Sequence, residues 1–307
     1  MQRAETTKQA TLESDRSETI TRALLRCGVV AGPLYIIVGA FQVLTRPGFD
    51  VRYNMLSQMS LGDQGWIQIA NFVVSGLLVL AGAVGIHRAL RSGAASTWGA
   101  RLVGVYGLGL IAAAIFSADP GFGFPPGTPA GPPTTMSTHS LLHFVSALFG
   151  FVAIIGACVV FARRFAVLGQ RGWATYSVVT GVVFLVAFLG TASGSGGVPF
   201  TLALWGALAL AWVWLSAVAA KLIDYALRRR HNSATTNGAA SVHSRDVDRL
   251  AAPFVFSGAA SRRTRPQLPS TERPRPHRRS HRPARGTKRR RTRPRRRRAG
   301  PPAPTAG

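Results

Sequence analysis

The sequence predicts an all-α polytopic membrane protein, a six-transmembrane-helix bundle followed by a disordered basic C-terminal tail. Three observations predict this fold class. Six apolar segments recur along the middle of the chain, and each is close to the roughly 20 helical residues that cross a hydrocarbon core of about 30 Å. Residues 24–227 hold only ten Lys or Arg and four Asp or Glu, too few to cover a soluble domain of that length. Arginines also gather in every second connection between the segments.

The chain begins with a polar segment, residues 1–23, in which four basic and four acidic residues balance. Because of these acidic residues, and because no small-residue cleavage site follows, we do not expect a signal peptide. The first predicted span, 24–44, should therefore remain in the protein. Within it Gly28 and Gly32 stand four residues apart, a spacing that lets a neighbouring helix backbone approach closely.

The second predicted span, 66–86, opens with Trp66, and an amphipathic ring at this position suits the level of the lipid headgroups. The most polar side chains within the predicted spans are Gln42, Asn71 and Ser75. Hydrogen bonds between helices are the ordinary use of such side chains in a membrane. We therefore expect these three side chains to form hydrogen bonds between helices.

The third predicted span, 102–118, is the shortest of the six. The fourth, 141–161, is preceded by Ser137 and Thr138, and either hydroxyl can cap the N-terminus of a helix. A polar outer loop, 119–140, connects these two spans. It carries no Lys or Arg although the whole chain has a net charge of +26. This loop is therefore expected to lie on the side of the membrane where positive charge is scarce.

The last two predicted spans, 174–192 and 200–222, are apolar throughout, with charges only near their ends. Trp205 and Trp212 stand seven residues apart and share a face of the sixth span. We expect packing or lipid contact for these rings rather than a platform for a ligand. A soluble protein with a buried helical core is the alternative for all six segments, and the scarcity of charges between them disfavours it.

The arginines predict the orientation of the chain. Connections 87–101 and 162–173 carry arginines and no acidic residue, whereas 193–199 carries no Lys or Arg and the arginines of 45–65 are balanced by aspartates. The arginines of the two basic connections are Arg88, Arg91, Arg101, Arg163, Arg164 and Arg171. Basic residues near span ends are retained on the cytoplasmic side. We therefore expect a multi-pass protein of the cell (cytoplasmic) membrane with both termini in the cytoplasm.

The predicted tail, residues 228–307, holds 23 of the 37 Lys and Arg and only three acidic residues. Proline is frequent and large apolar residues are almost absent after Phe256, so this segment cannot build a core. Three interpretations stay open: contact with anionic lipid headgroups, non-specific contact with nucleic acid, or incidental sequence from GC-rich codons. Contact with nucleic acid is the least favoured of the three.

Several segments together resemble one family of membrane proteins. They are LLRCGVVAGPLYIIVGAFQVLTRPGFD, LSQMSLGDQGWIQIANFVVSGLLVLAGAVGIHRAL, RLVGVYGLGLIAAAIFSADP, FPPGT and HSLLH. Together they resemble the bacterial family filed as domain of unknown function 998 (DUF998). The likeness covers roughly residues 24–225. It implies a multi-span inner-membrane protein and brings no established activity, substrate or catalytic residue. Similar sequences usually show a more regular His-Pro-x-Ser pattern where this chain has Tyr53-Asn54-Met55-Leu56-Ser57.

Weak candidates for a catalytic site lie in the outer loops. Asp119 follows the third span, where a carboxylate interacts unfavourably with the helix dipole. An aspartate at this position therefore suggests a specific role. His139 and His143 are one turn apart at the start of the fourth span and share a face. Two imidazoles and a carboxylate can bind a divalent metal or handle protons. Polar interface residues are the more frequent role of such histidines, and no metal or cofactor is predicted outside this alternative.

A pairing of charges between the outer loops is the favoured use of the same region. Asp119 can pair with a histidine or with Arg46 or Arg52 of loop 45–65, and Asp50 lies beside Arg52. Such pairs would hold the two long outer loops together. The apolar residues of loop 45–65 also suggest a short helix lying on the membrane surface.

The favoured function is that of a non-enzymatic integral membrane protein. No phosphate-binding loop, dinucleotide fingerprint or zinc-protease motif is present. The spans lack a charged residue near the middle of the membrane, which argues against a transporter with a charged midplane site. The alternative is a membrane-embedded metal-dependent hydrolase with an outward-facing Asp/His site, and the further alternative is a small-molecule or lipid transporter. The expected partner is the lipid bilayer itself.

Overall fold

The computed structural model describes residues 2–90, 92–193 and 197–250, and this part of the chain contains helices and no strand. Six of these helices are long and apolar enough to cross a membrane. They are α1 (Gln2–Thr45), α2 (Gly65–Leu90), α3 (Ala100–Ile115), α4 (Thr138–Val167), α5 (Arg171–Ala192) and α6 (Gly197–Leu250). The prediction of an all-α, six-span membrane protein is thereby confirmed.

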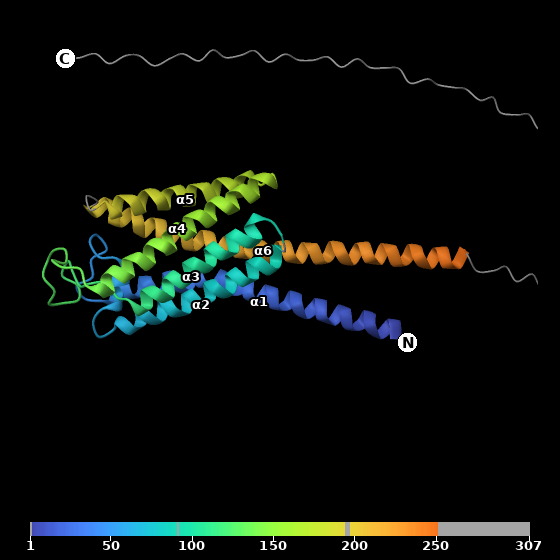
Figure 1. Ribbon diagram of the computed structural model, residues 1–307, viewed down its shortest axis with the longest axis horizontal. Coiled ribbons are helices and arrows are strands. Elements are labelled where there is room, and N and C mark those ends of the chain that lie inside the picture. Colours follow the sequence, from blue (N-terminus) through green and yellow to red (C-terminus); the bar gives the residue numbers. More distant parts are fainter. Residues whose placement is uncertain (1, 91, 194–196, 251–307) are drawn as a thin grey trace, which may run out of the picture. The chain divides into compact units, whose positions relative to one another are not determined.

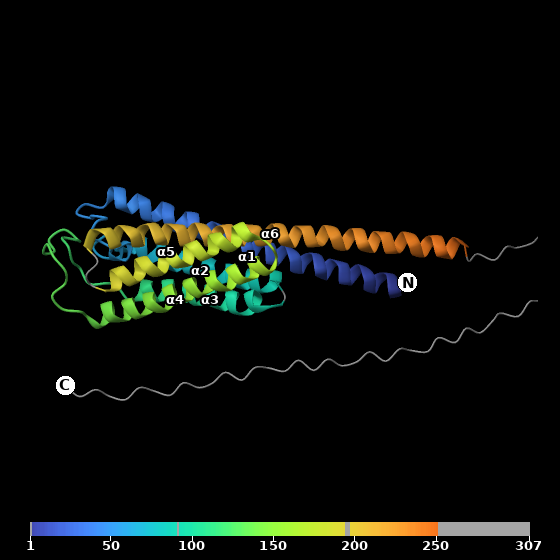
Figure 2. The same cartoon turned by 90° about the horizontal axis from the view of Figure 1, so that it is seen from above.

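The six helices form a ring in chain order. Each helix packs against the next one along the chain, and α6 closes the ring by packing against α1 (Figures 1 and 2). The short connections 91–94, 168–170 and 193–196 favour an antiparallel arrangement of the helices that they join. Much of the outward surface is apolar: Val178, Val182 and Val186 of α5 are all more than half exposed. A surface of this kind suits lipid chains rather than water.

The third span differs from its predicted limits. A π-helical turn, Ala95–Gly99, leads into α3, and α3 ends at Ile115 rather than at residue 118. Phe116 leaves the helix because its backbone is extended, with φ −105° and ψ 113°. The backbone N–H of Phe116 still donates to Ala112, 2.9 Å away, whereas the carbonyl of Phe116 is free to accept a hydrogen bond from α4.

Both terminal segments are more helical than predicted. The polar residues from Gln2 onward belong to α1, so the first span is the second half of a longer helix. Disorder was expected from residue 228 onward, and the structure continues α6 as far as Leu250. No proline interrupts the chain between Pro199 and Pro253, and the peptide N–H groups needed for a continuous helix are therefore all present. Residues 251–307 of the predicted tail lie outside the described residues.

Small residues bring the helices close together, as predicted for the first span. A methyl group added at Gly28 would lie 3.3 Å from the Cα atom of Gly82 in α2. One added at Gly32 would lie 2.7 Å from the carbonyl oxygen of Trp212 in α6. The methyl group at Gly28 would also lie 3.2 Å from the Cβ atom of Ala219 in α6, so both glycines bring α1 close to α6 and Gly28 brings it close to α2 as well.

A buried amide network joins α1 and α2, as expected for the polar residues of these spans. Gln42 donates from Nε2 to Oε1 of Gln68 over 2.8 Å, and Asn71 donates to the same oxygen over 3.2 Å. Ser75 donates to Asn71 over 3.3 Å. All four side chains are buried, where neither water nor lipid tails can hydrogen-bond to them. The hydrogen bonds among them therefore satisfy polar groups that would otherwise be unpaired.

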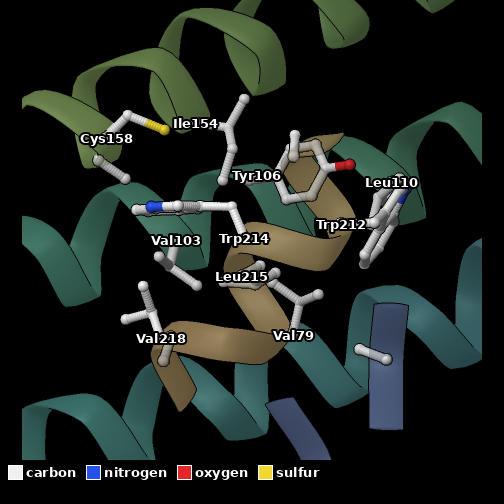
Figure 3. Close-up of a cluster of buried hydrophobic side chains, with 14 of the residues drawn as sticks. Val79, Val103, Tyr106, Leu110, Ile154, Cys158, Trp212, Trp214, Leu215 and Val218 are labelled. Carbon is white, nitrogen blue, oxygen red and sulfur yellow. The ribbon is translucent and has the colours of Figure 1, made fainter. Parts of the chain in front are cut away.

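The half of the ring away from the two long loops is filled by large side chains. Figure 3 shows Trp212, Trp214 and Leu215 of α6 among apolar residues of α2, α3 and α4. Trp214 is fully buried, and its indole N–H donates to Ser177 of α5 over 2.9 Å. The interior of the ring is therefore packed with side chains at this level.

Candidate functional site

Loop 46–64 folds back onto the ends of the helices. Arg46, which follows α1 directly, is 8% exposed and donates to the carbonyl oxygens of Met59 and Leu61 over 3.0 and 2.6 Å. Its guanidinium carbon also lies 5.2 Å from the ring centre of Phe124 in the second long loop. Burial lowers the pKa of Arg46, and Asp63 opposes this shift. The cation holds the loop in place by satisfying backbone carbonyls.

The short helix predicted for this loop exists, but it is not a membrane-surface helix. A 3₁₀ helix, Leu56–Ser60, places Leu56 and Met59 inside the bundle, where they are 6% and 0% exposed. The apolar side chains therefore fill the ring at the end that carries the two long loops, which is called the outer end below. Burial within the protein, rather than contact with lipid headgroups, accounts for the apolar pattern of this segment.

Of the charge pairs predicted for the outer loops, the described residues contain one that lies within loop 46–64 and none that joins the two loops. Asp50 pairs with Arg52, two residues away, at 2.6 Å, and this hydrogen bond lowers the pKa of Asp50. Neither Arg46 nor Arg52 reaches Asp119 within the described residues. The pair thus stabilises one loop and does not join two.

Neutral amides join the outer loops instead. Asn54 donates to the carbonyl oxygen of Gly121 over 3.2 Å, and Gln58 donates to that of Asp119 over 3.4 Å. Trp205 of α6 donates its indole N–H to the carbonyl oxygen of Asn54 over 3.2 Å. Sequence patterns did not predict these contacts, because Asn and Gln in loops are common and their partners are backbone atoms distant in the chain.

Asp119 owes its position to α4 rather than to α3. Its carboxylate accepts from the backbone N–H of Ser137 over 2.8 Å, at the residue that caps α4. Ser137 in turn accepts from the N–H of Ser140 over 3.1 Å. Hydrogen bonds from the side chain and from the backbone N–H of Ser137 lower the pKa of Asp119. A carboxylate at the N-terminal end of α4 complements the dipole of that helix. This interaction explains why an aspartate is found directly after α3, where it opposes the dipole of α3.

The two histidines meet the end of α3 without forming a metal site with Asp119. His139 is exposed and its ring lies 5.8 Å from that of Phe116. His143 is 4% exposed, and its Nδ1 lies 2.8 Å from the carbonyl oxygen of Phe116. Because a carbonyl only accepts, Nδ1 carries a hydrogen. Within the described residues no three His, Cys, Asp or Glu side chains are grouped as metal ligands.

A cavity of about 210 Å³ lies inside the outer half of the ring. All six helices contribute to its walls, and the wall residues include no Asp, Glu, Lys or Arg. Aromatic residues form its inner limit: the ring of Tyr35 stacks on that of Trp212 at 4.5 Å, and the ring of Tyr106 lies 5.4 Å from the same indole. His143, Ser57 and Thr191 are among the polar residues of the cavity walls. The cavity is an apolar pocket closed toward the middle of the bundle.

A larger and more polar hollow of about 620 Å³ lies outside this cavity, among the outer loops. Its walls include Arg52 and Asp119. Four residues line both spaces, namely Met55, Ser57, Phe144 and Thr191. The two spaces are thus adjacent, and the boundary between them is one layer of side chains thick. We call the outer space the vestibule.

Comparison with known proteins assigns the chain to a family. A family model described as "Protein of unknown function (DUF998)" matches residues 29–221, which is more than half of the chain and overlaps all six membrane spans. The chain belongs to the DUF998 family. Searches of curated proteins and of solved structures gave no match. This DUF998 protein is accordingly a multi-pass membrane protein whose activity must be inferred from its own side chains.

Proposed function

We propose that this DUF998 protein is a non-enzymatic membrane protein that binds an amphipathic molecule at its outer end. The apolar part of the ligand occupies the cavity, and the polar part lies in the vestibule. The observation that carries this proposal is the sharing of Met55, Ser57, Phe144 and Thr191 between an uncharged pocket and a charged one. An amphiphile likewise has an apolar end and a polar or charged end.

The size and closure of the cavity support binding rather than conduction. An apolar protein cavity of about 150 Å³ takes up benzene, so about 210 Å³ accommodates a ring or a short hydrocarbon segment. The Tyr35, Tyr106 and Trp212 rings close its inner end. An apolar chain that enters from the vestibule therefore stops among these rings.

Filling the cavity tests this function. Ala147 of α4 lines the cavity, and Ala147→Phe should weaken binding of a monoacyl phosphatidylcholine by roughly tenfold or more, equivalent to about 1.4 kcal/mol. Native mass spectrometry of the detergent-solubilised protein measures the bound fraction. Val145→Phe is the matched control, because Val145 is on the same helix, is 39% exposed and does not line the cavity. Equal affinity of the two variants, or no binding by the original protein, would reject the proposal.

We further propose that the vestibule faces the outside of the cell membrane and that both termini are cytoplasmic. The basic residues of the described connections support this orientation, because Arg88, Arg101, Arg163, Arg164 and Arg171 all belong to the ends of α2 to α5 opposite the vestibule. Figure 1 shows the start of α1 and the end of α6 projecting from that same end of the bundle. Arginines at span ends are retained in the cytoplasm.

Accessibility of introduced cysteines tests the orientation. With Cys27 and Cys158 replaced by serine and alanine, Ala130→Cys should react with a membrane-impermeant maleimide on intact cells. Ser92→Cys, at the other end of the bundle, should react only after the cells are opened. Ser92 is preferable to the adjacent Gly93, whose φ of 89° disfavours a side chain. Labelling of Ser92→Cys alone on intact cells would mean that the opposite orientation is correct.

A further inference from the structure

The charges that line the vestibule do not balance. Among its wall residues, Arg52 and Asp119 carry charges. The charge of Arg52 is already matched by Asp50, whose carboxylate accepts hydrogen bonds from the guanidinium over 2.6 to 3.0 Å. Asp119, by contrast, forms no ion pair with any of the described residues. The unmatched charge of the vestibule is therefore negative.

The neighbours of Asp119 stabilise its carboxylate as an anion and supply no full positive charge. Hydrogen bonds from Ser137 lower the pKa of Asp119, so the side chain is ionised at neutral pH. The dipole at the start of α4 is equivalent to about half an elementary charge and offsets only part of this anion. Asp119 is partly exposed, and the hydrogen bond between its Oδ2 and the Ser137 N–H is itself exposed. A molecule in the vestibule can therefore reach the carboxylate.

Aromatic rings line the same hollow. Phe122 and Phe144 both belong to its walls and are 36% and 52% exposed. A third ring, that of Tyr53, stacks on Phe122 and already has the guanidinium of Arg52 5.5 Å from its centre. The face of an aromatic ring attracts a cation, and quaternary ammonium ligands are recognised in this way. An unmatched carboxylate and exposed aromatic rings together suit an ammonium group.

The position of Asp119 along the bundle suits a headgroup. Its backbone N–H donates to Ser140 of α4 over 3.3 Å, and Phe144 follows Ser140 by one helical turn. Phe144 lines both the vestibule and the cavity. At 1.5 Å per residue the two positions on α4 are about 6 Å apart along the helix axis. A ligand whose apolar chain crosses from the cavity past Phe144 therefore brings its headgroup to the level of Asp119.

We propose that the amphipathic ligand carries a positively charged ammonium group, which lies against the Asp119 carboxylate and the Phe122 ring. This inference rests on the proposed function and adds to it the chemistry of the headgroup. The ammonium group can belong to a zwitterionic lipid or to a free alkylammonium ion. Both present the same cation at the end of an apolar chain.

Two lipids that differ in this group test the inference. The detergent-solubilised protein is titrated with a monoacyl phosphatidylcholine and with the monoacyl phosphatidylglycerol of the same chain, which has no ammonium group, and native mass spectrometry measures the bound fraction. The original protein should bind the phosphatidylcholine about 3- to 10-fold more tightly, the combined effect of one ion pair and one aromatic contact. General attraction to a chain of net charge +26 would give the opposite order. Equal binding of both lipids would overturn the inference and leave the proposed function in place, whereas binding of neither lipid would reject both.

Three variants assign the preference to named side chains. Asp119→Asn should bind the two lipids equally, because asparagine still accepts the hydrogen bond of the Ser137 N–H but carries no charge. Asp63→Asn is the matched control: it removes one negative charge from the outer loops, but Asp63 is exposed and does not line the vestibule, so the preference should stay. Phe122→Leu should weaken binding of the phosphatidylcholine alone, by about 2- to 5-fold. A preference that survives in Asp119→Asn, or that disappears in Asp63→Asn, would show that Asp119 does not bind the ammonium group.

Dodecyltrimethylammonium, which has no phosphate, separates the two sources of the cation. If Asp119→Asn weakens binding of this ion as much as binding of the phosphatidylcholine, then a free alkylammonium ion is a sufficient ligand. If the variant weakens binding of the phosphatidylcholine alone, then the ligand is the zwitterionic lipid.

Discussion

Replacing Arg46 by alanine should lower the free energy of unfolding by roughly 3–5 kcal/mol, the largest effect that we expect for a side chain of the outer loops. The guanidinium donates two hydrogen bonds from a buried position to the carbonyl oxygens of Met59 and Leu61. Alanine would leave both carbonyls without a donor and would remove the cation from the face of Phe124. Unfolding of the detergent-solubilised protein by sodium dodecyl sulfate, followed by circular dichroism, measures the change.

Arg52→Ala is the matched control for this prediction. Arg52 belongs to the same loop and pairs with Asp50, but its side chain is 60% exposed. Exposed ion pairs contribute about 0–1 kcal/mol, so this variant should unfold almost like the original protein. Arg46→Lys should be intermediate, because one ammonium cannot match the forked geometry of two guanidinium donors. Similar losses for Arg46→Ala and Arg52→Ala would contradict the role that we assign to burial.

The membrane fold could be predicted from the sequence because its main determinants are local. A segment of about 20 apolar residues spans the bilayer whatever its neighbours are, since the backbone must satisfy its own hydrogen bonds there. The ends of the helices were less predictable. At the end of α3 the carbonyl of Phe116 contacts His143 of another helix, and the local sequence does not reveal that contact. The continuation of α6 to Leu250 was not predicted, because charge and polarity suggested disorder in a stretch that contains no proline.

Of the outer site, the sequence indicated only Asp119, because its position is unusual for an acidic residue. Asp119 attracted notice because a carboxylate should not follow a helix C-terminus, and the structure gives it a partner at the start of α4. The identity of that partner depends on how loop 119–140 folds, which spacing in the sequence does not reveal. The cavity was likewise not predictable, because it is formed by side chains from all six helices. Each of these side chains, taken alone, is an ordinary residue of a membrane helix.

Gly32→Ala should destabilise the protein by roughly 1–3 kcal/mol, because the added methyl group has no room. It would lie 2.7 Å from the carbonyl oxygen of Trp212 and would also meet the Ser216 side chain. The carbonyl belongs to the backbone of α6 and cannot move away as a side chain can. The contact between α1 and α6 closes the ring, so the two helices must separate or tilt. The same detergent unfolding experiment measures the loss.

Gly206→Ala distinguishes this steric effect from the general effect of replacing glycine in a helix. Gly206 belongs to α6, and a methyl group added there meets no atom within 4 Å. Alanine is favoured over glycine within a helix by about 1 kcal/mol, so this variant should be as stable as the original protein or slightly more stable. The two substitutions are chemically identical and should change stability in opposite directions. If Gly32→Ala were as stable as Gly206→Ala, then the close approach of α1 and α6 would not be a determinant of the fold.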